Sequence, residues 1–336
     1  MRSASLTARF ASDKPWMPVI RRFKGILGLA GIIVIAIWIS PLASDGSNIF
    51  LEPGNITDIL RQMSVIGIIA LSMTYVILTA GIDLSVGSTL ALSTAVVAMF
   101  VTRPVLGGHW PGGLAAVAIG VGASALVGLL NGLVISTFRI QPFIVTLASM
   151  IGIRGLAKWL TNNANIDIGF GSDLAASFAA VAGRKIVVIG TFVLLAAIFW
   201  TVLERTVFGR YVRAVGDNEK ASKYTGLPVQ RVKVYVYMLC GTLSGVAGVL
   251  YAAQNHQGNP NAGVAYELDA IAAVVIGGAS LSGGRGSIGG TVVGILIMGV
   301  LTNMLRLKNV DSNAEMMIKA VIIVLAVAVQ KSGKSE

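Results

Sequence analysis

Two glycine-rich stretches have spacings that bind nucleotides in other proteins. Residues 328–335 (AVQKSGKS) follow the phosphate-binding loop pattern with alanine at the first glycine position, and Gly284, Gly286 and Gly289 match a dinucleotide-binding spacing. Both patterns work in a strand–loop–helix unit, because the N-terminus of the helix holds the phosphate. Only Glu336 follows the first stretch, and the second lies between two apolar runs. We therefore expect no nucleotide site, no cofactor and no ATP hydrolysis by this chain.

The residue types needed for metal binding or covalent catalysis are sparse. His109 and His256 are far apart in the sequence, and Cys240 stands alone in an apolar run. This pattern indicates neither a metal cluster nor a disulfide framework. No Ser/His/Asp group, zinc-protease motif or facing pair of carboxylates is recognisable. The chain is therefore expected not to be an enzyme.

Two carboxylates stand out because they border apolar runs. Asp83 lies in TAGIDLSVGS and Asp269 in YELDAIAAVVIGG. A charged side chain at the centre of a membrane helix costs about 2.5–3.5 kcal/mol on insertion scales, so hydroxyls, backbone N–H groups or water must satisfy it. Ser85 and Ser88 are the local candidates for Asp83, in an Asx or N-cap arrangement. We expect both acids to organise irregular backbone beside a path through the membrane; a cap at the membrane surface and a direct substrate contact are the alternatives.

The composition indicates a membrane protein. The 336 residues are 55% hydrophobic and only 12% charged, whereas soluble domains contain about 25% charged residues. The net charge of +11 comes largely from cations in the two tails and in residues 204–233. These cations form no continuous basic face with interleaved aromatic residues, so a nucleic-acid partner is not indicated. They instead indicate orientation in a lipid bilayer.

The apolar runs predict an all-α polytopic bundle of about ten transmembrane helices, since about 20 apolar residues cross the hydrocarbon. The windows are 26–42, 60–79, 86–101, 113–138, 143–160, 186–203, 234–255, 268–281, 288–305 and 316–329. The third and eighth are short, which indicates broken spans that line a cavity or are covered by protein. The excess of Lys and Arg places both termini in the cytoplasm, with tails at 1–25 and 331–336 around a membrane domain at 26–330. Only Arg184, Lys185, Arg306 and Lys308 oppose this orientation.

Three glycine pairs at four-residue spacing predict close helix contacts: 128/132, 241/245 and 290/294. Such pairs let helix backbones approach closely in a membrane. Packing within the bundle is the favoured interpretation, and a homodimer seam is the alternative. Residues 79–88 and 275–290 also share glycine, serine and apolar residues beside a short span. Their placement is consistent with an inverted repeat, whose interface commonly forms a transport path.

The polar stretch 204–233 predicts a cytoplasmic element that binds a soluble partner. Asn218 can cap a short helix, with Glu219 favoured in its first turn. Gly226 suits the C-terminal turn, and Pro228 prevents continuation. The expected coupling residues are Asp217, Asn218, Glu219, Ala221, Ser222, Gly226 and Pro228, with Ala221 and Ser222 small enough to let a partner approach.

Several motifs occur together in one order along the chain. They are IDLSVGS (82–88), NG (131–132), QPFIVTL (141–147), FGR (208–210), AVGDNE (214–219), Gly226 and YELDAIAAVVIGG (266–278). From about residue 55 to residue 329 they resemble the ribose-type permease subunits of bacterial ABC sugar importers. The candidate path residues, all of them from these motifs, are Asp83, Ser85, Ser88, Asn131, Gln141 and Asp269. Departures from the family pattern at Ala80, Ser222 and Ala279 leave the exact sugar open.

The resemblance implies a permease in the bacterial inner membrane that moves a pentose, hexose or small polyol. The implied partners are an ATP-binding cassette subunit, a periplasmic sugar-binding protein, and a second permease copy or sister permease. A permease of the related branched-chain amino-acid branch is one alternative. A self-contained secondary transporter is another; it would need buried ionisable groups, for which Asp83, Arg154 and Asp269 are the candidates. A membrane-embedded enzyme is the least favoured.

Overall fold

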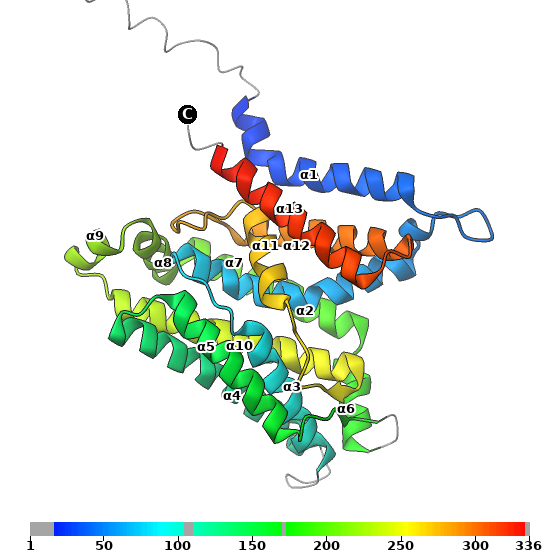
Figure 1. The fold of residues 1–336 in the computed structure, drawn as a ribbon, viewed down its shortest axis with the longest axis horizontal. Helices are drawn as coiled ribbons and strands as arrows, with labels where there is room; N and C mark the ends of the chain where they lie inside the picture. Colours follow the sequence, from blue (N-terminus) through cyan, green and yellow to red (C-terminus); the bar gives the residue numbers. More distant parts are fainter. Residues whose placement is uncertain (1–16, 104–109, 170–172, 333–336) are drawn as a thin grey trace, which may run out of the picture.

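The computed structural model describes residues 17–103, 110–169 and 173–332. The described part holds thirteen α-helices, one 3-10 turn and two strands of two residues each, and the long helices form one bundle (Figure 1). Most of the predicted N-terminal tail (residues 1–16), His109 and residues 333–336 lie outside the described residues. The phosphate-loop-like stretch therefore enters the structure only through the end of the last helix, which reaches Ser332.

Each of the ten predicted spans coincides with a helix. These helices are α1 (Met17–Ile39), α2 (Pro53–Leu78), α3 (Val86–Thr102), α4 (Trp110–Phe138), α5 (Pro142–Leu160), α7 (Lys185–Arg205), α10 (Val229–Asn255), α11 (Tyr266–Ile276), α12 (Ile288–Leu307) and α13 (Ser312–Ser332). Six of them, α2, α4, α5, α7, α10 and α12, are long and apolar enough to cross a membrane. The structure thus confirms an all-α membrane bundle.

The remaining elements are short and lie between these helices. They are η2 (Ile49–Leu51), β1 (Ile166–Asp167), α6 (Leu174–Ala182), α8 (Val207–Asp217), α9 (Glu219–Tyr224) and β2 (Gln257–Gly258). The two strands pair antiparallel, Ile166 with Gly258 and Asp167 with Gln257. They join the segment that follows α5 to the segment that follows α10.

Three boundaries differ from the sequence prediction. Helix α11 ends at Ile276, so the window 268–281 is an 11-residue helix followed by irregular chain. The polar stretch 204–233 is shorter than expected, because its first two residues complete α7 and its last five begin α10. Helix α6 was not predicted. The Asp173 carboxylate begins it by accepting a hydrogen bond from Ala176 N at 2.9 Å.

All three glycine pairs pack against backbone within the chain. A Cβ atom on Gly128 would collide with the Tyr237 carbonyl oxygen, and one on Gly241 would collide with the Ser124 carbonyl oxygen, so α4 and α10 meet backbone to backbone. Gly294 on α12 lies in the same way against Ala273 on α11. The prediction of close packing within the bundle is therefore confirmed for these faces.

Two cations that opposed the predicted orientation have partners. Lys185 Nζ lies 2.8 Å from an Asp58 carboxylate oxygen. Arg306 Nε lies 3.5 Å from a Glu315 carboxylate oxygen, and the Arg306 guanidinium donates a hydrogen bond to the Gln62 side-chain oxygen at 2.7 Å. Both cations therefore have polar partners on neighbouring elements.

The α4–α10 contact yields a matched pair of variants. We expect Gly128→Ala to lower the melting temperature of the purified chain, because overpacking costs about 1–3 kcal/mol. Gly122→Ala on the same helix has open space around its new methyl group and should be neutral or slightly stabilising. Thermal unfolding in detergent measures both. Equal melting temperatures for the two variants would contradict the close contact.

Candidate functional site

Helices α8 and α9 form a capped, two-helix element at one end of the bundle, opposite the end where α6 lies (Figure 1). Gly209 N donates a hydrogen bond to the Thr206 hydroxyl at 3.3 Å, which caps α8. Ala221 N donates to the Asn218 side-chain oxygen at 2.9 Å, which caps α9 as the sequence predicts. Glu219 occupies the first turn of α9, where the helix dipole favours a negative charge.

Gly226 ends α9 in the way the sequence predicts. Its φ is +82°, a conformation that favours glycine. Gly226 N donates to the Lys223 carbonyl at 3.1 Å, and Leu227 N donates to the Ser222 carbonyl at 3.0 Å. This pair of bonds is a Schellman motif. Pro228 follows and precedes the first turn of α10.

Ser222 corrects one prediction about this surface. Its side chain is buried, and its hydroxyl donates a hydrogen bond to the Ala214 carbonyl at 2.8 Å. Ser222 therefore fastens α9 to α8 and does not face outward. Ala221 remains exposed, as predicted, and Tyr224 on the same helix is 89% exposed. The outward surface of α9 thus combines a small residue with a projecting aromatic ring.

The C-terminal end of α8 packs closely against the bundle. A Cβ atom on Gly216 would collide with the Leu78 carbonyl oxygen, so α8 lies against the last residue of α2. The same carbonyl accepts a hydrogen bond from Gly284 N at 3.0 Å. Asp217, the last residue of α8, contacts the chain at Gly284. The element therefore contacts both the end of α2 and the irregular segment between α11 and α12.

Ion pairs connect the same element to its flanking helices. Lys233 on α10 lies 2.8 Å from Glu219 on α9. Arg213 on α8 pairs with Glu204 on α7. A movement of α8 and α9 would therefore act on α7 and α10 as well.

A second group of candidate residues forms a buried polar cluster between α2, α3 and α4. Asp83 is 1% exposed and accepts hydrogen bonds from Ser85 N (2.9 Å) and the Ser85 hydroxyl (2.6 Å), which is the expected Asx arrangement. Asn131 Nδ2 donates to the Ser85 hydroxyl at 3.0 Å, and the Ser88 hydroxyl donates to the Ser85 carbonyl at 2.8 Å. Ser85 is thus the centre of the cluster.

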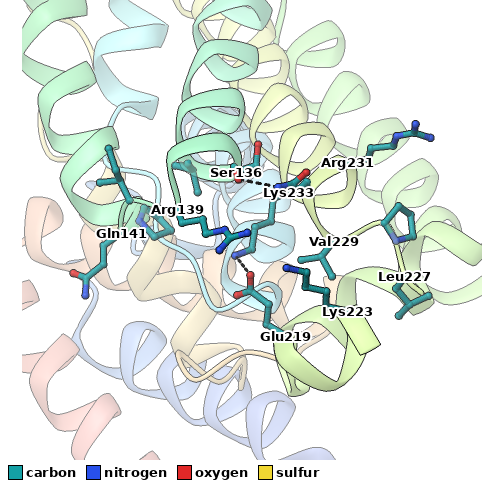
Figure 2. Close-up of a pocket in the computed structure, with 14 residues that line it drawn as sticks. Ser136, Arg139, Gln141, Glu219, Lys223, Leu227, Val229, Arg231 and Lys233 are labelled. Carbon is teal, nitrogen blue, oxygen red and sulfur yellow. Dashed lines mark hydrogen bonds and ion pairs between the residues drawn. The ribbon is translucent and has the colours of Figure 1, made fainter. Parts of the chain in front are cut away.

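The other two candidate path residues lie elsewhere. Gln141 is exposed at the start of α5 and borders a cavity beside α9, where its side chain points away from the charged groups (Figure 2). Asp269 on α11 lies 3.6 Å from Lys319 on α13, which also lies 2.9 Å from Glu315. The six residues therefore form no single site in this structure.

Some polar residues in the bundle were not predicted as site residues. Lys319, Glu315 and Glu267 belong to this set, and Arg154 was named only for the secondary-transporter alternative. The Arg154 guanidinium donates hydrogen bonds to the Pro260 carbonyl at 2.9 Å and to the Ala262 carbonyl, which holds the chain leading into α11. A lysine inside an apolar run was a usable signal for Lys319, and Glu315 precedes it by four residues on the same helix, whereas the contact with Asp269 becomes evident only in the fold.

No metal or nucleotide site is evident in the part of the chain that the structure describes. Within that part, no group of three or more His, Cys, Asp and Glu residues could hold a metal ion. Gly284 and Gly286 lie between two helices and pack against Asp217 and Ala279, without a β-α-β unit. Their role here is close chain packing.

The central position of Ser85 leads to a stability prediction. Ser85→Ala should lower the free energy of unfolding by about 1–3 kcal/mol, because buried groups on Asp83 and Asn131 each lose a partner. Ser88→Ala is the matched control, since the carbonyl it leaves still accepts Thr89 N at 2.8 Å. Thermal unfolding in detergent compares the two. A cost for Ser88→Ala as large as that for Ser85→Ala would refute the central role of Ser85.

Comparisons with known proteins identify the family. A family model described as branched-chain amino acid transport system / permease component matches residues 55–327. The chain is 41% identical to the ribose import permease protein RbsC of Bacillus subtilis, over 93% of this chain and 94% of that protein. It is 40% identical to RbsC of Escherichia coli K12, over 98% of both chains.

A third relative is the L-arabinose ABC transporter permease protein AraH of Azospirillum brasilense, 37% identical over 90% of this chain and 87% of that protein. No solved structure matches. The matches span almost the whole bundle, including both α9 and the buried polar cluster. This chain therefore belongs to the branched-chain amino acid transport system / permease component family, within its ribose-type group of ABC import permeases.

Proposed function

We propose that this chain is the membrane-spanning permease subunit of an ATP-driven importer that brings a monosaccharide into the cytoplasm. The observation that carries the proposal is the capped α8–α9 element, wedged against the ends of two membrane segments, in a chain whose relatives are named as ribose, arabinose and fructose permeases. A pentose, a hexose or a small polyol is the substrate class. A periplasmic binding protein would deliver it.

The exposed face of α9 is the proposed docking surface for a separate ATP-binding subunit. Ala221 lets the partner approach, while the caps at Asn218 and Gly226 keep the helix rigid. A rigid-body movement of the partner would pass through α8 to Leu78 on α2 and to Gly284 before α12. A flexible loop could not transmit such a movement. A second copy of this chain or a sister permease would complete the transporter.

The translocation path is proposed to run beside the irregular chain at 79–85 and at 277–287. Asp83, Ser85, Ser88 and Asn131 hold the first segment, and Asp269 anchors the helix that precedes the second. The two segments meet where Gly283 packs against Ala80. Their proximity supports an inverted repeat with the path at its interface. Gln141 would act at the cytoplasmic mouth.

Ten membrane helices and two cytoplasmic termini complete the proposal. The first residues of α1 and the last of α13 lie at the same end of the bundle as α9 (Figure 1). Residues 1–25 and 331–336 would then flank the membrane domain at 26–330, with the coupling element within 204–233. The bacterial inner membrane is its proposed location.

Branched-chain amino-acid import is the second candidate, because the matching family model is described by that activity. The relatives that are named as ribose and L-arabinose permeases match this chain over most of their length, which favours sugar import. Uptake assays with labelled ribose and labelled leucine in cells that express the whole transporter distinguish the two.

Cysteine labelling tests the proposed orientation. In a chain with Cys240→Ser, an impermeant maleimide added to intact cells with a permeable outer membrane should label Ala164→Cys and not Lys220→Cys. Both side chains are exposed, so accessibility within the fold does not bias the result. Labelling of residue 220 with protection of residue 164 would reverse the proposed topology.

Copurification tests the docking surface. Ala221→Trp should block the ATP-binding subunit by bulk. Gly226→Val should weaken docking by straining a left-handed backbone, at a cost of about 1–2 kcal/mol. Ala180→Trp, on the exposed face of α6 at the opposite end of the bundle, is the matched control and should retain the partner. Wild-type copurification and sugar-stimulated ATP hydrolysis in both α9 variants would show that coupling lies elsewhere.

A further inference from the structure

A cavity of about 600 Å³ opens beside α9, and most of its lining residues are neither coupling nor path candidates. It lies between the end of α4, the start of α5, helix α9 and the start of α10 (Figure 2). Its walls include Arg139, Lys223, Arg231 and Lys233, with Glu219 as the one acid among the lining residues. The cavity therefore carries a strong positive charge at the end of several membrane helices.

Three of these cations converge on one point. The side chains of Arg139, Lys223 and Lys233 point toward one another around Glu219, whereas Arg231 points away (Figure 2). Lys233 pairs with Glu219 at 2.8 Å and is only 16% exposed. Arg139 and Lys223 have no side-chain hydrogen bond or ion pair to any residue that the structure describes. One acid thus faces three cations, and the excess is suited to an anion.

The backbone at Arg139 adds an independent observation. Its φ is +55°, in the left-handed region where glycine is the unstrained choice. The residue directly follows α4, and the turn of the chain at this point does not itself require a long side chain. An arginine here places a guanidinium, which binds phosphate oxygens in a bidentate manner, at the mouth of the cavity.

Apolar residues form the rest of the wall. Ile135, Ile140 and Leu227 line the cavity beside the cations. Phe138 (69% exposed) and Phe143 (50% exposed) are the neighbours in sequence of the lining residues Arg139 and Pro142, at the end of α4 and the start of α5. A soluble anion would use only the charged half of the site. A phospholipid would use both halves, with its phosphate among the cations and its acyl chains along the aromatic residues.

We propose that this cavity binds the headgroup phosphate of an anionic phospholipid. Basic pockets between membrane helices on the cytoplasmic side bind such headgroups. The bound lipid would bridge α4 and α5 to α9 and steady the docking helix. Its placement in the cytoplasmic leaflet rests on the proposed function, whereas binding itself does not.

Native mass spectrometry of the purified full chain tests the proposal. The probes are phosphatidylglycerol, phosphatidylcholine with the same acyl chains, and glycerol 3-phosphate as the soluble headgroup. The wild-type chain should retain phosphatidylglycerol in preference to the other two. The double variant Arg139→Gln/Lys223→Gln should bind it about thirtyfold more weakly, because each cation near an anionic lipid contributes about a fivefold factor.

Two further variants separate specific binding from other effects. Arg210→Gln/Arg285→Gln removes two exposed cations that do not line the cavity and should leave retention unchanged. Arg139→Gly relieves the backbone strain, so it should keep the melting temperature while weakening retention. Three results would each overturn the proposal. The first is an equal loss of phosphatidylglycerol retention in the two double variants, and the second is unchanged retention in Arg139→Gln/Lys223→Gln. The third is binding of glycerol 3-phosphate as tight as binding of the lipid. The assay needs neither the ATP-binding subunit nor sugar, so its failure is distinct from failure of the proposed function.

Discussion

The carbonyl group of Leu78 is the point where three parts of the molecule meet. As the last residue of α2, it has no helical partner for its oxygen, and a buried carbonyl must be satisfied. Gly284 N supplies the hydrogen bond, and Gly216 lets the end of α8 lie against the same group. Any side chain at Gly216 would push these segments apart. The helix end, the docking element and the segment before α12 are therefore held together by backbone contacts that allow little independent movement.

The same logic explains why so many contacts in the bundle rely on glycine. Lipid tails are as apolar as leucine, so hydrophobic burial does little to hold membrane helices together, and close van der Waals packing matters more. Helices α4 and α10 approach through Gly128 and Gly241, and α11 and α12 approach through Gly294. Rigid helix pairs of this kind can move as units when α8 is displaced.

Features that depend on local sequence could be predicted, and features that depend on tertiary contacts could not. The cap at Asn218 and the positive φ at Gly226 follow from residue type and spacing, because each bond spans only a few residues. The burial of Ser222 could not be deduced, since it depends on the angle at which α9 folds back on α8. The contact between Lys319 on α13 and Asp269 on α11 likewise joins residues far apart in sequence. Helix α6 was missed because nine residues are too few to give a membrane-length apolar run.

The two acids of the proposed path, buried Asp83 and half-buried Asp269, are satisfied in different ways. Asp269 lies in a chain of alternating charge with Lys319, Glu315 and Arg306, whose Coulomb interactions act over several ångströms and tolerate small shifts. Asp83 instead accepts short hydrogen bonds from Ser85, and no ion pair to it occurs among the described residues. Such bonds weaken steeply with misalignment. Because Asp83 and Ser85 are only two residues apart, these bonds stiffen the turn that leads into α3 and move with it, whereas the Asp269–Lys319 pair ties α11 to α13.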